Sequence, residues 1–145
     1  MRARVYRQVY FVMNKRSILM IAALNGVICI SLGAIAAHFL KEKISSDNLS
    51  VFDTGVRYQF YQTFALVVVA FMIEKDPSKY LKYTSVLFTA GIILFSFSLY
   101  FLSLRQLMGI SNDEMRWVGA ITPIGGISHI VGWLLIFVSA YKKRI

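Results

Sequence analysis

The chain has 145 residues, 57% of them hydrophobic, and a mean hydropathy of +0.61, which together exclude an ordinary soluble domain. A formal net charge of +9 would suit a nucleic-acid-binding protein, but the basic residues lie between apolar segments and form no groove-binding helix, so no nucleic-acid partner is expected. The single cysteine, Cys29, excludes an intrachain disulfide. We therefore expect one all-α integral membrane domain.

Residues 1–16 form a basic, amphipathic N-terminal flank. The segment contains Arg and Lys but no acid, and Val, Tyr and Phe residues are interleaved with them. The favoured interpretation is a positively charged flank beside the first membrane span, and the alternative is an amphipathic anchor or partner-binding arm. Residues 17–145 are predicted to form the transmembrane domain.

The first predicted span covers residues 17–40, which carry no charge and reach roughly 36 Å as a helix, enough to cross a bilayer. Small residues follow a helical period along it, and close approach at small residues holds membrane helices together. One small-residue stripe consists of Ala22, Gly26, Cys29, Gly33 and Ala36. A second consists of Val27, Ser31, Ala34 and His38. Two stripes predict two helix neighbours.

The second and third spans are predicted over residues 55–73 and 80–104, joined as a tight hairpin. An amphipathic segment over residues 45–57 should continue into the second span as one helix. In the turn between the spans, Asp76 can cap the next helix and Pro77 can occupy its first position. The third span has a small and polar seam formed by Thr89, Ile93, Ser96, Tyr100 and Ser103.

The fourth span is predicted over residues 123–141, with Thr122 as its N-cap. Ser111 and Glu114 have the spacing of a capping box, so a short helix should precede it, either separate from the last span or kinked into it at Pro123. A stripe along the last span consists of Thr122, Gly125, His129, Gly132, Ile136 and Ser139. The glycines expected at helix contacts are Gly26, Gly33, Gly125, Gly126 and Gly132.

The distribution of charge predicts the orientation. With four spans, both termini and the turn after the second span share one side, and that side carries the entire net positive charge. The positive-inside rule makes this side cytoplasmic. We expect a four-helix bundle in the cell's inner membrane, crossing it several times, with both ends inside.

Four sequence blocks resemble the signatures of domain-of-unknown-function family 423, which includes small bacterial inner-membrane proteins and an animal relative named transmembrane protein 256. The blocks are residues 32–38, 58–66, 91–100, and 122–126 with 132–133. The chain departs from the family pattern at Ala36 and Phe97, where the family has glycine, at Gln62, where it has histidine, and at His129, where it has an aromatic residue. The resemblance implies a four-helix membrane protein and brings no established activity or catalytic residue.

Polar side chains are predicted to meet at one depth in the outer half of the membrane. The candidate intramembrane cluster consists of His38, Gln59, Gln62, Ser96, Tyr100 and His129. Buried polar groups in a membrane mark a functional-site hypothesis, but we favour a hydrogen-bond cluster that fixes helix register. Two histidines without a carboxylate beside them are a poor metal or haem site, so no metal and no cofactor is expected.

The expected function is structural. No nucleophile stands with both a base and an orienting partner, so no catalytic residue is expected and the protein should not be an enzyme. The first hypothesis is a structural or accessory component of a membrane assembly, contacting the lipid bilayer and either a membrane protein partner or further copies of itself. The alternative is a small-molecule or ion-conducting protein that acts as an oligomer through the polar cluster.

Overall fold

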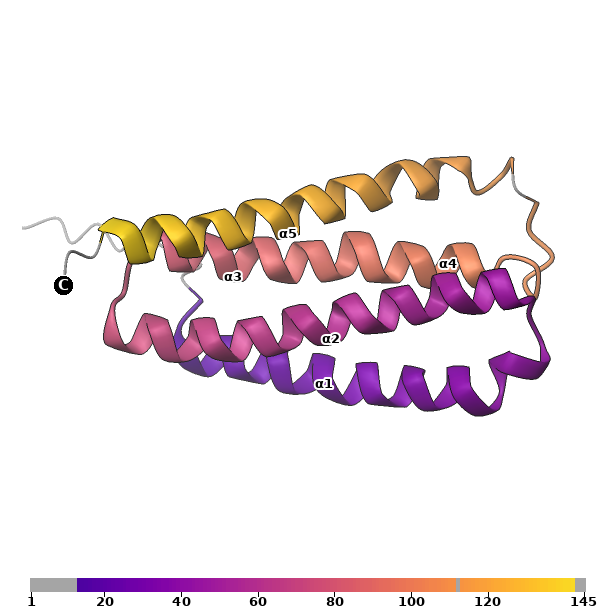
Figure 1. Cartoon of the computed structure of the whole chain (residues 1–145), viewed down its shortest axis with the longest axis horizontal. Coiled ribbons are helices and arrows are strands. Elements are labelled where there is room, and N and C mark those ends of the chain that lie inside the picture. Colours follow the sequence, from indigo (N-terminus) through magenta and orange to yellow (C-terminus); the bar gives the residue numbers. More distant parts are fainter. Residues whose placement is uncertain (1–12, 112, 143–145) are drawn as a thin grey trace, which may run out of the picture.

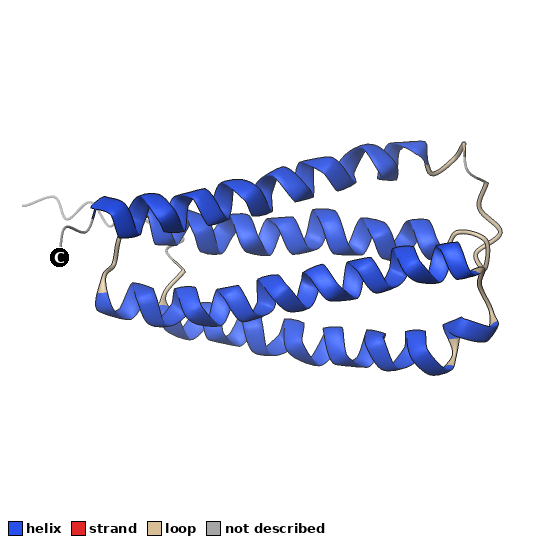
Figure 2. Cartoon of the chain, in the orientation of Figure 1, coloured by secondary structure: helices blue, strands red, loops and turns tan. Residues whose placement is uncertain are grey.

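Residues 13–111 and 113–142 are described by a computed structural model, and in this part of the chain all regular structure is helical (Figures 1 and 2). Four helical segments are long and apolar enough to cross a membrane. This confirms the predicted all-α, four-helix, multi-pass membrane fold. The segments are α1 (Lys15–His38), α2 (Ser46–Lys75), the continuous unit of α3 (Lys79–Gly91), η2 (Ile92–Phe97) and α4 (Ser98–Leu104), and α5 (Arg116–Lys142). A short 3₁₀ turn, η1 (Leu40–Glu42), follows α1.

The two ends of the bundle differ in composition. The basic end holds Lys15, Lys75, Lys79 and Lys142, where α1 and α3 begin and α2 and α5 end. An ion pair of 2.6 Å between Lys15 and Glu74 joins α1 to α2 at this end. The opposite end, called the far end below, holds η1, the start of α2 and the loop before α5. Residues 1–12 of the predicted N-terminal flank lie outside the described residues, and Lys15 and Arg16 belong to α1.

The helices are arranged as an open array in which α1 and α5 occupy opposite edges (Figure 1). Helix α1 packs along α2, and α2 packs along α3, η2 and α4, which in turn pack along α5. The prediction that α1 has two helix neighbours is therefore wrong within the described chain. Its first small-residue stripe faces α2, where Ala22, Cys29 and Ala36 are buried, whereas the second stripe stays exposed.

Two apolar clusters hold the array together, with polar residues between them. The cluster nearer the basic end centres on Ile18, Leu66, Leu81 and Phe88, and the cluster at the far end centres on Phe52 of α2. Along α2 the buried polar residues Gln59, Gln62 and Thr63 separate Phe52 from Leu66. This polar layer is where the candidate functional residues lie.

The helix starts differ from the prediction at two places. The N-cap of α3 is Ser78, whose hydroxyl accepts the Tyr80 N–H at 3.2 Å, so Asp76 does not cap α3 and Pro77 is not its first residue. Asp76 instead ends α2, donating its backbone N–H to Met72. The helix begins later than expected because the Ser78 hydroxyl satisfies one of the free N–H groups of the first turn of α3.

Helix α5 runs from Arg116 through Pro123 without interruption, so of the two arrangements left open the preceding helix is continuous with the last span, and the prediction that Thr122 is an N-cap is wrong. In lipid a broken helix would leave backbone groups without partners, which favours continuation past a proline when a hydroxyl is nearby. Because Pro123 has no N–H, the Gly119 carbonyl loses its α-helical donor, while the Thr122 hydroxyl lies 3.4 Å from the Val118 carbonyl and 2.7 Å from the Ser98 hydroxyl.

The capping box before α5 is confirmed. One Glu114 oxygen accepts the Ser111 N–H at 2.9 Å and its hydroxyl at 2.7 Å, while the Glu114 N–H points back to the Ser111 hydroxyl at 3.4 Å. These hydrogen bonds from Ser111 lower the pKa of the Glu114 carboxyl. Gly109, with a φ of 68°, makes the turn that leads from α4 into this segment.

Candidate functional site

A chain of hydrogen bonds connects three helices through the polar layer. The Tyr100 hydroxyl of α4 donates to Gln59 Oε1 of α2 at 2.6 Å, and Gln59 Nε2 donates to Asn25 Oδ1 of α1 at 3.1 Å. The Asn25 amide then donates to the Ile21 carbonyl at 3.0 Å. Gln59 is fully buried, so both ends of its carboxamide are satisfied by protein groups alone. This network fixes the relative register of α1, α2 and α4.

Gly55 makes room for the Tyr100 ring. A methyl group added at Gly55 would lie 2.7 Å from Cε1 of Tyr100 and 3.1 Å from the Ser96 carbonyl oxygen, both closer than side chains normally approach. One turn away on α2, the Phe52 ring packs on Tyr100 with a centroid distance of 4.7 Å. The absence of a side chain at Gly55 therefore allows the tyrosine to reach Gln59.

The segment η2 is a π turn, and it lies where α5 approaches most closely. A methyl group added at Gly125 of α5 would collide with the backbone of Leu94 and Phe95. Single π turns inside α-helices are frequent at functional sites. Ser96, within this turn, is fully buried, and its hydroxyl has no hydrogen-bond partner among the described residues.

His129 of α5 is enclosed by α3 and η2. A methyl group added at Gly91 would lie 2.5 Å from Nδ1 and Cε1 of the imidazole, and the rings of Phe88 and Phe95 flank it at centroid distances of 6.4 and 5.8 Å. Only 4% of His129 is exposed, and neither ring nitrogen has a hydrogen-bond partner in the described structure. A buried imidazole with two unpaired nitrogens is costly to keep.

Four residues of this layer are buried with polar atoms that no described residue satisfies. They are Gln62, Thr63, Ser96 and His129. Such groups are rare in proteins, and each calls for an explanation such as a ligand or a bound water. The layer therefore combines one satisfied network with a second set of groups that could still hold a polar ligand.

The structure brings together only part of the predicted cluster. Gln59 and Tyr100 are hydrogen-bonded. The Tyr100 ring and the Ser96 backbone carbonyl oxygen both lie close to Gly55. His38 does not join them, because it is the last residue of α1 and is exposed. Its inclusion in the cluster is corrected: α1 turns this residue away from α2, the helix along which α1 packs in the described part of the chain.

Three residues of the site were missed in the sequence. Asn25 is the one carboxamide in the first predicted span, and a carboxamide at that depth is itself a signal. Gly55 and Gly91 each face a ring from another helix, Tyr100 and His129 respectively. No pattern within one helix shows which glycine will meet a ring, because that depends on how the helices are placed.

The predicted packing glycines fall into two groups. At Gly125 an added methyl group would meet backbone, and at Gly132 it would overlap the Phe88 ring. At Gly26, Gly33 and Gly126 the nearest atoms would be 4.0, 3.6 and 3.7 Å away, which is ordinary contact. Among the predicted packing glycines, close approach is thus confined to the contact of α5 with α3 and η2.

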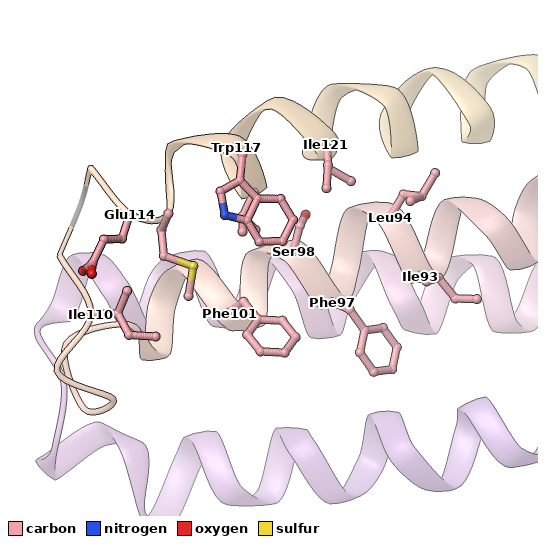
Figure 3. A pocket seen from close by; sticks show the side chains of 11 residues that line it. Ile93, Leu94, Phe97, Ser98, Phe101, Ile110, Glu114, Trp117 and Ile121 are labelled. Carbon is pink, nitrogen blue, oxygen red and sulfur yellow. The ribbon is translucent and has the colours of Figure 1, made fainter.

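Two grooves of similar size open on the surface. The first, about 540 Å³, lies between η2 and α4 on one side and the start of α5 on the other, and Figure 3 shows its side chains. Its walls include Phe97, Phe101 and Trp117, and Ser98 at its edge is already bonded to Thr122. The second, about 550 Å³, lies between α2 and α5 and contains Gln62 among aromatic side chains.

The chemistry open to the polar layer is hydrogen bonding by neutral groups. Its members are amides, hydroxyls and one imidazole, with no carboxylate. Among residues 13–111 and 113–142 there is no group of three or more His, Cys, Asp or Glu side chains placed to hold a metal ion. The layer can therefore bind or orient a neutral polar molecule.

Comparison with known proteins places the chain in a family. A family model described as "Protein of unknown function (DUF423)" matches residues 32–126. The chain belongs to this family. The UPF0382 membrane protein YwdK of Bacillus subtilis (strain 168) is 39% identical over 125 residues, covering 86% of this chain and 95% of the relative. The UPF0382 inner membrane protein YgdD of Escherichia coli (strain K12) is 34% identical over 132 residues, covering 91% and 95%. No solved structure matches.

The range matched by the DUF423 model includes only part of the polar layer. Gln59, Gln62, Ser96 and Tyr100 lie inside it, whereas Asn25 and His129 lie outside. The names of the relatives describe membrane proteins, in agreement with the four membrane-spanning helices of this DUF423 chain. The resemblance to family 423 predicted from the sequence is confirmed.

Proposed function

We propose that this protein is a non-enzymatic structural or accessory component of a membrane assembly, joined either by further copies of itself or by another membrane protein. The observation that carries the proposal is the free face of α1. Within residues 13–111 and 113–142 this helix packs mainly along α2, and its opposite side is exposed.

The free face of α1 has the composition of a helix-docking surface. It carries the second small-residue stripe, Val27, Ser31, Ala34 and His38, and all four residues are exposed. Small side chains let a second helix come close enough for van der Waals contact, and Ser or His side chains add hydrogen bonds between helices. An imidazole left facing hydrocarbon would be costly, so a polar partner near His38 would relieve that cost.

The hydrogen bonds already formed within the polar layer support a role without catalysis. Tyr100, Gln59 and Asn25 are joined by hydrogen bonds, and the Cys29 thiol donates to the Val56 carbonyl at 3.2 Å. A nucleophilic mechanism needs a nucleophile, a base and an orienting group in contact. The layer offers an imidazole at His129 with no hydroxyl or thiol bonded to it.

The proposed orientation places the basic end in the cytoplasm. Lys15, Lys75, Lys79 and Lys142 all lie at this end, and a cytoplasmic excess of Lys and Arg is the usual determinant of topology. In that orientation the Asn25–Gln59–Tyr100 network lies deep in the membrane and η1 faces outward.

A second candidate function is supported by the unpaired polar groups. Gln62, Thr63, Ser96 and His129 could line a path for a small molecule or ion if several copies assembled around it. The open array of four helices does not enclose such a path alone, so this function would also require assembly.

The test of the assembly role uses two exposed alanines of α1. Ala34→Leu adds bulk to the free face, whereas Ala37→Leu adds the same bulk to an exposed position outside the small-residue stripe. The protein is extracted in a mild detergent, and co-purifying chains are measured by mass spectrometry. We expect Ala34→Leu to lose partners that Ala37→Leu retains. Equal retention of all partners by both variants would contradict docking on this face.

A further inference from the structure

We propose that the groove between α2 and α5 binds a neutral, flat, ring-containing apolar molecule that carries a hydroxyl group. The site goes beyond the assembly role, since α1 lies at the other edge of the array and contributes no residue to this groove.

The walls of the groove select for a ring. Its volume of about 550 Å³ is within the range of small-molecule sites, and most of its lining is aromatic. Tyr58, Tyr61 and Phe64 come from α2 and Trp133 from α5. Aromatic side chains bind flat rings by offset or edge-to-face stacking, which gives such a site its shape preference.

Gln62 supplies the polar contact. It lines the groove, only 4% of it is exposed, and its Oε1 has no hydrogen-bond partner among the described residues. An amide oxygen accepts hydrogen bonds, so a hydroxyl on the ligand that donates to Oε1 would satisfy it. An unpaired carboxamide inside a membrane protein is costly without such a ligand.

The lining also excludes charged ligands. It contains no Lys, Arg, Asp or Glu among the described residues, so a phosphate or an ammonium group would enter without a counter-charge. A transmembrane helix is a poor occupant as well. Close helix packing uses small residues, which the free face of α1 offers and which the bulky rings of Tyr58 and Trp133 do not.

The rings around the groove lead inward to His129. Tyr58 contacts Phe95 at a centroid distance of 4.9 Å, and Phe95 contacts the imidazole. Trp133 contacts Phe88 at a centroid distance of 5.5 Å, and Phe88 also flanks the imidazole. The unpaired His129 therefore lies one ring behind the groove on both sides, and a bound ring would extend this aromatic row.

The experiment compares two probes of equal shape, 2-naphthol and 2-methylnaphthalene, which differ only in an oxygen-bearing group. The protein is labelled with 5-fluorotryptophan in a Trp117→Phe background, so that Trp133 gives the single fluorine NMR signal. Trp117 is 66% exposed and lies outside the groove, so its replacement should not disturb the fold. Each probe is titrated into full-length protein in lipid nanodiscs.

We expect a saturable shift of the Trp133 signal, with 2-naphthol binding about three- to thirty-fold more tightly than 2-methylnaphthalene, the range of one hydrogen bond in a membrane protein. Gln62→Leu should remove this preference and keep the weaker apolar binding. Because it replaces an unpaired buried amide by a group of similar size, this variant should fold. Equal affinity of the two probes for the unmodified groove, or an unchanged preference in Gln62→Leu, would overturn the proposal.

A second pair of variants tests the location. Val68→Phe narrows the groove, whereas Val86→Phe makes the same change on α3, away from it, and both valines are about half exposed. We expect Val68→Phe to weaken both probes at least fivefold and Val86→Phe to leave them unchanged. Undiminished binding to Val68→Phe would place the probes elsewhere and contradict the assignment.

Discussion

The imidazole of His129 lies directly against Gly91. At this contact α5 presents its bulkiest buried polar side chain, and α3 presents a residue without a side chain. A methyl group at Gly91 would come within 2.5 Å of the ring. This relationship sets the distance between the two helices at mid-membrane, and it makes the two residues energetically dependent on each other.

Gly91→Ala should therefore destabilise the protein by about 1–3 kcal/mol, the usual cost of overpacking. The control is Gly119→Ala on α5, where an added methyl group meets nothing within 4 Å and the better helix propensity should stabilise by about 0.5–1 kcal/mol. Unfolding in mixed micelles, followed by circular dichroism, measures both. In His129→Ala the penalty of Gly91→Ala should largely disappear, and a penalty of undiminished size would show that the two residues are not coupled.

Tyr100→Phe should destabilise by about 0.6–2 kcal/mol, because it leaves Gln59 Oε1 buried without its donor. Tyr83→Phe is the matched control, since Tyr83 is 61% exposed on α3 and should tolerate loss of its hydroxyl. The same unfolding assay applies. The penalty at Tyr100 should shrink in a Gln59→Leu background, and if it persisted there the hydrogen bond would not be its origin.

Periodic features of single helices were predictable from the sequence. The stripe on the last span marks the buried face of α5, where Gly125, His129, Gly132 and Ser139 are all buried. The capping box needed only two residues three apart, and the amphipathic segment before residue 57 continues into α2 as one helix. Each of these depends on local spacing, which a sequence states directly.

Relations between helices were not predictable in the same way. His38 was placed with the polar cluster because its depth matched, but depth does not say which side of α1 faces a neighbour. Asn25 was missed because its partner, Gln59, is 34 residues away and is set by helix register. The sequence left open whether the helix would be interrupted at Pro123 or run into the last span, and the structure shows one helix, in keeping with the cost of unpaired backbone in lipid.

Gly132→Leu should impair folding more than Val131→Leu. Both changes add apolar bulk to adjacent residues of α5, but a side chain at Gly132 would overlap the Phe88 ring, whereas Val131 is 38% exposed. We expect a loss of about 1–3 kcal/mol at Gly132 and little change at Val131. The yield of monodisperse protein in detergent gives a first measure. Equal yields would mean that the small-residue stripe of α5 is not a packing surface.

The topology follows from the charge at the basic end. In a Cys29→Ala background, single cysteines are introduced at Lys79 at the basic end and at Ser46 at the far end, both exposed. A membrane-impermeant maleimide added to intact cells should label the Ser46 site and should reach the Lys79 site only after lysis. Labelling of the Lys79 site in intact cells would reverse the orientation.

The most direct test of the assembly role is the mass of the protein as it exists in its own membrane. The chain is extracted with its surrounding lipid by an amphipathic polymer and analysed by native mass spectrometry. If the free face of α1 docks another helix, the released species should exceed the 16.5 kDa of one chain by the mass of a second copy or of another membrane protein, and Ala34→Leu should reduce it to a single chain. A wild-type protein released only as a 16.5 kDa chain with bound lipid would contradict the account.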